Sequence, residues 1–177
     1  FSAAVLKAKQ ANTDIVFAYT NEEESARLLR ELRKQGVTKP IVGETVLTSQ
    51  KVIELAGEAA NGAVAHVGLS VDAPIPAMRA FRAKFEKEWK FTPDHNGIKG
   101  YTGMYIMKAA IEKAGKVDRA LVVKTLHGLS LKAADHPGIL MDVSVDANGD
   151  LDRESFIVEA RDGKQVVKET VPALGAK

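Results

Sequence analysis

Three short runs of hydrophobic residues predict the strands of a sheet in the first half of the chain. They span residues 15–19, 40–43 and 63–67. The first run, Ile-Val-Phe-Ala-Tyr, is apolar throughout and does not alternate with polar side chains. Continuous apolar strands are typical of a parallel sheet that is covered on both faces.

Segments with the helical spacing of apolar residues lie between and after these runs. From residue 21 to 34, Ala26, Leu29 and Leu32 form one inward stripe. Asn21 is placed to cap this helix, and Glu24 three residues later completes a pattern that resembles a capping box. The same reasoning predicts helices over residues 1–12, about 49–56, about 76–90, about 98–114 and about 118–127.

The order of elements changes after the third strand. Consecutive helices follow one another, and residues 138–145 then return to a short β-like pattern. Two further strands, 156–161 and 165–170, flank Asp162-Gly163, which is a strong hairpin signal. The sequence therefore predicts an α/β protein with a doubly wound parallel sheet that ends in an antiparallel hairpin. The break at residues 93–97 is the expected crossing between two lobes.

The chain opens on a predicted helix with no strand before it. A helix of this kind normally follows one strand of an α/β sheet and leads back to the next. We therefore expect the chain to be a piece of a larger α/β protein. Any site that it carries is then expected to be only part of a site.

Composition narrows the class of protein. The chain has 177 residues, 45% of them hydrophobic, which is enough for one substantial core or two small ones. The net charge is +2, and Lys and Arg alternate with Glu along the predicted helices, which argues against nucleic-acid binding. The absence of cysteine excludes disulfides and thiolate chemistry. No apolar run approaches the roughly 20 residues of a membrane-spanning helix.

Polar residues follow two of the predicted strands. Tyr19, Thr20 and Asn21 come after the first strand, and Glu44 and Thr45 come after the second. In an open α/β sheet, ligands lie beyond the carboxyl ends of the strands, where a carboxylate can hold an ammonium group. These five residues are therefore candidate ligand contacts. The alternative role of Asn21 is helix capping alone, and Glu44 is equally compatible with a solvated loop.

Tyr101 is a sixth candidate, because it lies near the expected crossing and its hydroxyl would face a cleft there. The alternative is a core position, which the apolar spacing of Met104 and Ile111 also favours. A core stripe is likewise expected from three aromatic residues spaced four apart: Phe81, Phe85 and Trp89.

Strong catalytic motifs are missing from the sequence. It contains neither a dinucleotide-binding glycine motif nor a P-loop, and its four histidines lack the spacing of a helical zinc site. Asp146, Asn148 and Asp150 suggest calcium, but the glycine and glutamate of an EF-hand loop are not at the required positions, so a polar β-turn is expected. The chain is therefore not expected to be an enzyme or to hold a cofactor or metal.

An ordered set of short stretches extends over essentially the whole chain: residues 1–17, 40–43, 55–62, 100–101, 109–115, 146–150 and 162–164. Together they resemble the periplasmic substrate-binding proteins of branched-chain amino-acid ABC transporters, the Leu/Ile/Val-binding type with the type I periplasmic-binding fold. The match is to the carboxyl-terminal half of such a protein. The resemblance implies that residues 1–94 form most of the second α/β lobe, that residues 95–149 belong to the first lobe, and that residues 150–177 return to the second.

The same resemblance implies a solute-binding component of an ABC importer, in the periplasm or lipid-anchored at the cell surface. Such a protein captures an amino acid or a related small polar molecule between two lobes and presents it to a membrane permease. The missing amino-terminal half would hold most of the first lobe. A ligand-sensing regulator or receptor domain of the same fold is the alternative, and a small α/β enzyme is the third.

The ligand contacts of the family match this chain only in part. An acidic residue that binds the ligand ammonium falls at Thr45 in the simplest register, with Glu44 one position earlier. An aromatic contact falls near Asn21, with Tyr19 close by. These departures extend the expected ligand to a polar amino acid, an amide or another small carboxylate.

Overall fold

The computed structural model describes residues 1–176, and its chain divides into two compact units. The first unit holds residues 1–68 and 156–170, and the second holds residues 69–155 and the chain from residue 171 onward. The expected change of lobe near residue 94 does not coincide with this division. The helix over residues 76–89 belongs to the second unit together with the helix that follows it, and the rings of Phe81 and Tyr101 join the two helices at 4.8 Å.

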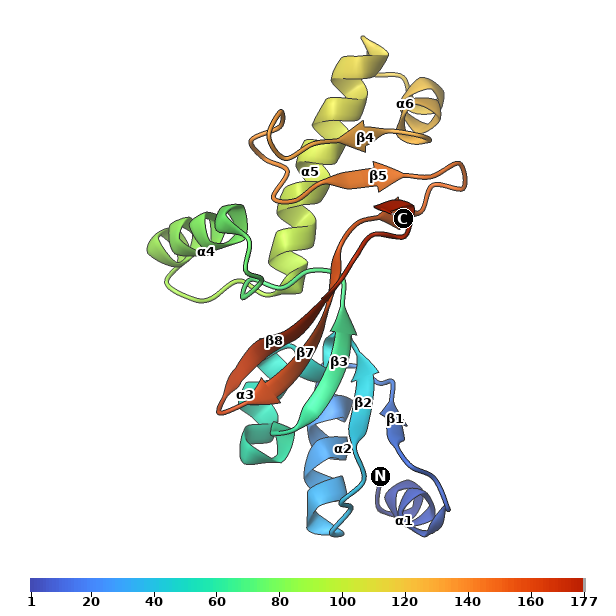
Figure 1. Cartoon of the computed structure of the whole chain (residues 1–177). Coiled ribbons are helices and arrows are strands. Elements are labelled where there is room, and N and C mark those ends of the chain that lie inside the picture. The colour runs from blue at the N-terminus through green and yellow to red at the C-terminus, as the bar shows by residue number, and fades with distance from the viewer. Residues whose placement is uncertain (177) are drawn as a thin grey trace. The chain divides into compact units, whose positions relative to one another are not determined.

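A five-stranded sheet forms the centre of the first unit, in the order β1-β2-β3-β7-β8 (Figure 1). The apolar runs form β1 (Val16–Ala18), β2 (Ile41–Glu44) and β3 (Ala63–Val67), which are parallel as predicted. β7 (Ser155–Arg161) pairs antiparallel with β3, and β8 (Lys164–Val171) lies beside β7. This mixed sheet confirms the predicted α/β class.

The predicted hairpin at the end of the sheet is also confirmed. Asp162 and Gly163 connect β7 to β8, and their φ angles are 50° and 77°. Positive φ at both positions is the geometry of a type I′ turn, and glycine and aspartate tolerate left-handed backbone better than most residues.

Helices precede or follow each parallel strand of the first unit. They are α1 (Ser2–Gln10), α2 (Glu22–Lys34), the 3-10 helix η1 (Thr45–Thr48), α3 (Gln50–Ala56) and the 3-10 helix η2 (Gly57–Ala60). The bounds of α1, α2 and α3 lie within a few residues of the predicted ones, whereas η1 and η2 were not predicted and flank the predicted helix over residues 49–56. The short η1 follows β2 directly, so it positions the residues after that strand.

The strands of the first unit bury one face of the sheet and leave the other partly exposed. Ile41 and Ala63 join the helix residues Leu29 and Leu32 in one buried cluster. On the opposite face of β1, the side chain of Phe17 is exposed. The expectation of strands covered on both faces is therefore wrong for β1, because the helices of this cluster pack on one side only.

The described part of the second unit contains three α-helices and a three-stranded antiparallel sheet in the order β4-β5-β6. None of the helices in residues 1–176 has the length and hydrophobicity of a membrane-spanning helix. The sequence did not predict β4 or β6, because strands of two residues show no periodicity. The elements are α4 (Pro76–Trp89), α5 (His95–Ala114), α6 (Arg119–Leu126), β4 (Ser130–Leu131), β5 (Val143–Val145), β6 (Leu151–Asp152) and, near the end, the 3-10 helix η3 (Leu174–Ala176).

The segment that was expected to cross between lobes instead begins α5. Asp94 caps this helix, since one carboxylate oxygen accepts the backbone N–H groups of Asn96 at 2.9 Å and Gly97 at 3.0 Å. The chain passes between the two units elsewhere, after Gly68, Ser155 and Thr170.

α5 contributes to a buried cluster that belongs wholly to the second unit. Ala109 and Ala110 of α5 pack with Val122 of α6 and Val143 of β5. The aromatic residues of α4 do not form the buried stripe that their spacing predicted. Phe81 and Phe85 are half-buried and Trp89 is exposed.

Candidate ligand-binding edge

Five of the six predicted contact residues lie at one edge of the first unit's sheet. β1, β2 and β3 are parallel, and their register pairs Ala18 with Gly43 and Gly43 with Ala65. The residues that follow these strands therefore lie at the same, carboxyl-terminal edge. This edge is the place where open α/β sheets bind ligands.

Glu44 and Thr45 form the centre of this edge. Glu44 is the last residue of β2, and its Oε1 accepts the N–H of Val46 at 3.1 Å, so the carboxylate caps η1. The Thr45 hydroxyl donates to the carbonyl oxygen of His66 on the neighbouring β3 at 3.4 Å. Both side chains are partly exposed, so the carboxylate and the hydroxyl reach solvent beside one another in sequence.

Tyr19, Thr20 and Asn21 lie next to them at the end of β1. Tyr19 and Asn21 are exposed. Thr20 is half-buried, and its hydroxyl lies 2.8 Å from the hydroxyl of Ser25 in α2. Asn21 occupies the N-cap position of α2, but its side chain makes no capping hydrogen bond. The Asn21 side chain therefore does not cap α2, and the prediction that it would is wrong.

Tyr101 belongs to the second unit and does not join this edge. Because α5 begins at His95, Tyr101 lies in the second turn of the helix, with its ring 5.0 Å from that of Tyr105. Burial raises the pKa of Tyr101, and the hydrogen bond and charge interaction with Tyr105 raise it further. Tyr101 also lines a cavity of about 490 Å³ together with aromatic residues of α4.

Sequence reasoning missed two residues that shape the edge. His66 pairs with Glu44 in the register of β2 and β3, and its side chain is exposed. The alternation along β3 was the available signal, because Ala63, Ala65 and Val67 point inward and leave His66 on the other face. Gln165 of β8 donates to the carbonyl of Thr48 at 2.9 Å, which ties the hairpin to η1. No sequence signal links residues so far apart.

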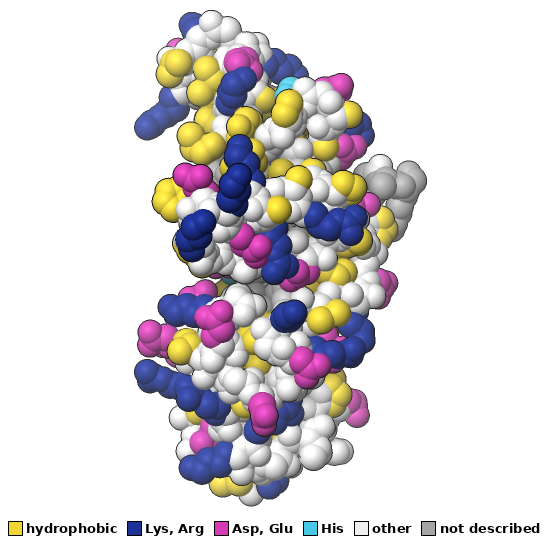
Figure 2. All heavy atoms as spheres, turned by 90° about the vertical axis from the view of Figure 1, so that its left-hand side faces the viewer, with side chains coloured by type: hydrophobic (Ala, Val, Ile, Leu, Met, Phe, Trp, Pro, Cys, Tyr) yellow, Lys and Arg dark blue, Asp and Glu magenta, His cyan; other side chains and the backbone are white. Residues whose placement is uncertain are grey.

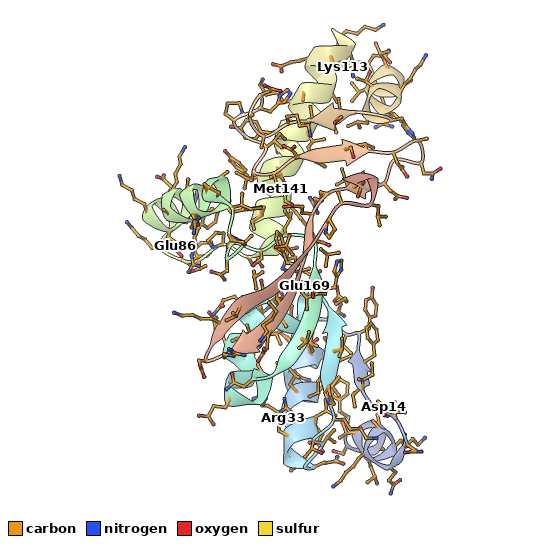
Figure 3. The ribbon with its side chains drawn as sticks, in the orientation of Figure 1. Asp14, Arg33, Glu86, Lys113, Met141 and Glu169 are labelled. Carbon is orange, nitrogen blue, oxygen red and sulfur yellow. The ribbon has the colours of Figure 1, made fainter. Side chains whose placement is uncertain are left out.

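A second cavity, of about 680 Å³, lies within the second unit. Leu131, Leu140 and Met141 contribute apolar side chains to its wall, and Met141 is labelled in Figure 3. Arg153 lines it as well, and burial lowers the pKa of its guanidinium. Within residues 1–176, Arg153 makes no hydrogen bond or ion pair. The cavity therefore combines an apolar wall with a guanidinium group that has no partner within residues 1–176.

The turn after β5 behaves as a structural element. One carboxylate oxygen of Asp146 accepts the N–H groups of Asn148 at 2.8 Å and Asp150 at 2.9 Å, and the bond from Asp150 is the main cause of the lowered pKa of Asp146. Among the described residues, no group of three His, Asp or Glu side chains is arranged to hold a metal ion. The predicted polar β-turn is confirmed.

Comparison with known proteins shows which family the chain resembles. A model of the periplasmic binding protein family matches residues 1–165. The Leu/Ile/Val-binding protein homolog 3 of Brucella melitensis is 30% identical over 172 residues, which is 94% of this chain and 44% of that protein. The chain thus spans less than half the length of the curated relatives that it matches.

Solved structures agree on the fold. A leucine-binding protein from Thermotoga maritima superposes with a TM-score of 0.83 at 21% identity, covering 97% of this chain and 48% of that one. A solute-binding protein of an ABC transporter from R. palustris, in complex with benzoate, gives a TM-score of 0.82 at 19% identity, covering 97% of this chain and 47% of that one. With a family match over residues 1–165 and this shared architecture, the chain belongs to the periplasmic binding protein family.

Proposed function

We propose that this chain supplies part of the solute-binding component of an ABC importer, which captures an amino acid or a related small polar molecule. The single observation that carries the proposal is the carboxyl edge of the parallel sheet. There, the Glu44 carboxylate and the Thr45 hydroxyl lie beside the polar residues Thr20 and Asn21. A carboxylate at this position suits a ligand ammonium group, and the neighbouring hydroxyl and amide groups suit its polar atoms.

The wider setting of the protein is part of the same proposal. The chain would act without catalysis, in the periplasm or anchored by lipid at the cell surface, and would deliver its ligand to a membrane permease. We also propose that the first unit is most of the second lobe and that the second unit belongs to the first lobe. The end of the first unit's first segment at Gly68 supports a change of lobe after that residue, where the family resemblance alone suggested residue 95.

The candidate edge is proposed to form one wall of a two-walled site, with the other wall in the missing amino-terminal half. Calorimetry of this chain and of the longer gene product would test this, with leucine, glutamine and benzoate as ligands. Each lost hydrogen bond of about 1–1.5 kcal/mol weakens binding by roughly tenfold, so we expect this chain alone to bind about 100-fold more weakly. Full-strength binding by this chain would contradict the two-walled site.

Substitution of Glu44 would test the proposed ammonium contact. Glu44→Gln removes the negative charge and keeps the size of the side chain, so we expect roughly tenfold weaker binding of amino acids by the longer protein. Binding of benzoate, which has no ammonium group, should not weaken. Glu54→Gln, at an exposed position of α3 in the same unit, is the matched control. An equal loss for amino acids and benzoate would argue against the role of Glu44.

A further inference from the structure

The cavity of about 680 Å³ is bounded by segments that lie far apart in the sequence. They are the start of α4, β4 with the two residues after it, β5 with the residues just before it, residues 152–154, and part of the segment 172–175. All of these segments belong to the second unit, whereas the candidate edge belongs to the first. The volume is in the range of small-molecule sites, so residues of the second unit alone could hold a ligand there.

Core side chains form the apolar part of the cavity wall. They are nearly fully buried and comprise Leu131, Leu140, Met141 and Val143. Leu131 and Val143 also belong to the buried cluster of the second unit, so packing in the core holds this part of the wall in place. Apolar walls are typical of small-molecule sites, where a small number of polar groups fixes the orientation of the ligand.

Arg153 brings an unpaired positive charge to this cavity. It is half-buried, and within residues 1–176 its guanidinium makes no hydrogen bond or ion pair. Burial lowers its pKa, but a guanidinium stays protonated in proteins, so Arg153 cannot avoid the cost of burial by losing its proton. Charged side chains of both signs lie interspersed on the surface that Figure 2 shows, where water solvates them. A charge that is partly removed from water needs a partner instead.

The carboxylates that line the cavity do not supply this partner. Both oxygens of Asp142 are engaged, by the Lys132 ammonium at 2.8 Å and by a backbone N–H group at 2.9 Å. Both oxygens of Asp152 accept backbone N–H groups, each at 2.8 Å. Glu154 is exposed, and its carboxylate makes no ion pair with Arg153. The guanidinium of Arg153 is therefore free to bind an anion that the described residues do not provide.

We propose that this cavity is a binding site, separate from the candidate edge, for a small monocarboxylate with an apolar body, such as a short-chain fatty acid. The guanidinium of Arg153 would hold the carboxylate through two parallel hydrogen bonds, and the hydrocarbon body would lie against Leu131 and Leu140. The expected ligand has no ammonium group, because the carboxylates of Asp142 and Asp152 are already engaged. This inference goes beyond the proposed function and does not rest on it.

Titration of the 177-residue chain with hexanoate, followed by two-dimensional NMR spectroscopy, tests the proposal. We expect the side-chain N–H signal of Arg153 and the amide signals of residues 140–144 to shift together, and the amides of Glu44 and Thr45 to stay in place. Each buried methylene changes the affinity roughly fourfold, so butyrate, which is two methylenes shorter, should bind about 15-fold more weakly. Hexanamide lacks the charge and norleucine adds an ammonium group, so each should bind at least about tenfold more weakly.

Two substitutions of Arg153 separate its charge from the shape of its guanidinium. Arg153→Gln removes the charge and should weaken hexanoate binding at least about tenfold, whereas Arg153→Lys keeps the charge and should weaken it roughly threefold. Arg119→Gln removes an exposed guanidinium from α6 of the same unit and should leave the affinity unchanged. Without ligand, Arg153→Gln should keep or raise the midpoint of thermal unfolding, because it removes an unpaired charge. A lower midpoint would assign Arg153 a structural role instead.

Three further results would overturn the proposal. The first is equal affinity for hexanoate and hexanamide, or no shift of the Arg153 signal with either, which would mean that water alone solvates the guanidinium. The second is unchanged hexanoate binding by Arg153→Gln. The third is hexanoate binding by the 177-residue chain that vanishes in the longer gene product, because another part of the protein would then fill the cavity. Glu44→Gln should leave hexanoate binding unchanged, and Arg153→Gln should leave amino-acid binding unchanged, so this site and the proposed function can fail independently.

Discussion

Gly43 allows β1 and η1 to lie close to β2 beside the candidate edge. A Cβ at this position would lie 2.6 Å from the carbonyl oxygen of Ala18 on β1 and 2.6 Å from Cδ2 of Leu47 in η1. Neither atom can move easily, because one belongs to the backbone of the neighbouring strand and the other to a buried side chain. The position of Glu44, directly after this glycine, depends on the same close approach.

Gly43→Ala is therefore expected to destabilise the first unit. Overpacking of a filled site costs about 1–3 kcal/mol in the free energy of unfolding, which urea titration followed by circular dichroism would measure. Gly100→Ala is the matched control, since its Cβ meets no atom within 4 Å. That substitution should stabilise the chain by about 0.5–1 kcal/mol through helix propensity. Equal effects of the two substitutions would show that the close contact at Gly43 is relieved without cost.

At the scale of elements, α2 and α6 both have an N-cap residue of a type that commonly caps helices, but only one of the two side chains makes a capping hydrogen bond. The carboxylate of Asp118 accepts the N–H of Leu121 at 2.9 Å at the start of α6. At the start of α2, the side chain of Asn21 makes no such bond. We expect Asp118→Ala to lower the free energy of unfolding by about 1 kcal/mol and Asn21→Ala to change it by less than about 0.5 kcal/mol. Urea unfolding would measure both, and a larger loss for Asn21 would contradict the observed caps.

The connection between β4 and β5 carries an ion pair whose contribution depends on pH. Lys132 Nζ lies 2.8 Å from Asp142 Oδ2, and the N–H of Ala133 donates to Oδ1 at 2.9 Å. The bond from Lys132, followed by the bond from Ala133, lowers the pKa of Asp142. A lowered folded-state pKa means that the stabilisation is present above the ordinary aspartate value of about 3.9 and is lost as the pH falls through the lower folded value.

Asp142→Asn should therefore lower the midpoint of thermal unfolding at pH 7, with the difference from the unsubstituted chain shrinking as the pH falls below about 4. Calorimetry at a series of pH values would measure it. The effect should be small, since both side chains are well exposed to solvent. Asp135→Asn removes a nearby exposed carboxylate and serves as the control for net charge. A difference that stays constant from pH 7 to pH 3 would show that the charge of Asp142 contributes nothing.

Local signals predicted the elements well, and non-local contacts account for what they missed. The apolar runs located the three parallel strands, and Asp162-Gly163 located the hairpin, because these features depend on neighbouring residues. The start of α5 lies three residues before the predicted one, because the apolar spacing begins only at Ile98, whereas the cap at Asp94 starts the helix at His95. The predicted ends of β1 and β2 were sufficient to place five of the candidate contact residues at one edge of the sheet. The pairing of His66 with Glu44 depends on strand register, which no local pattern specifies.

At the scale of the whole chain, the sequence predicted a change of lobe near residue 95, whereas the compact units of the structure divide after Gly68. The division depends on contacts such as that between Phe81 and Tyr101, which are 20 positions apart and lie on separate helices. The exposure of Phe17 could not be predicted from the sequence either, because the apolar run of β1 predicts a strand that is covered on both faces.

Each unit has its own buried cluster, and we expect the two units to unfold separately. Leu29 is fully buried in the cluster of the first unit, and Ile139 is buried in that of the second. Leu29→Ala should destabilise by about 2–5 kcal/mol and speed amide hydrogen exchange in α2 and β2, whereas exchange in α5 should change little. Ile139→Ala should act in the reverse sense, which makes each variant the control for the other. Mass spectrometry of exchange in peptides from both units would measure this. If either substitution sped exchange equally in α2 and α5, the two units would unfold as one cooperative unit.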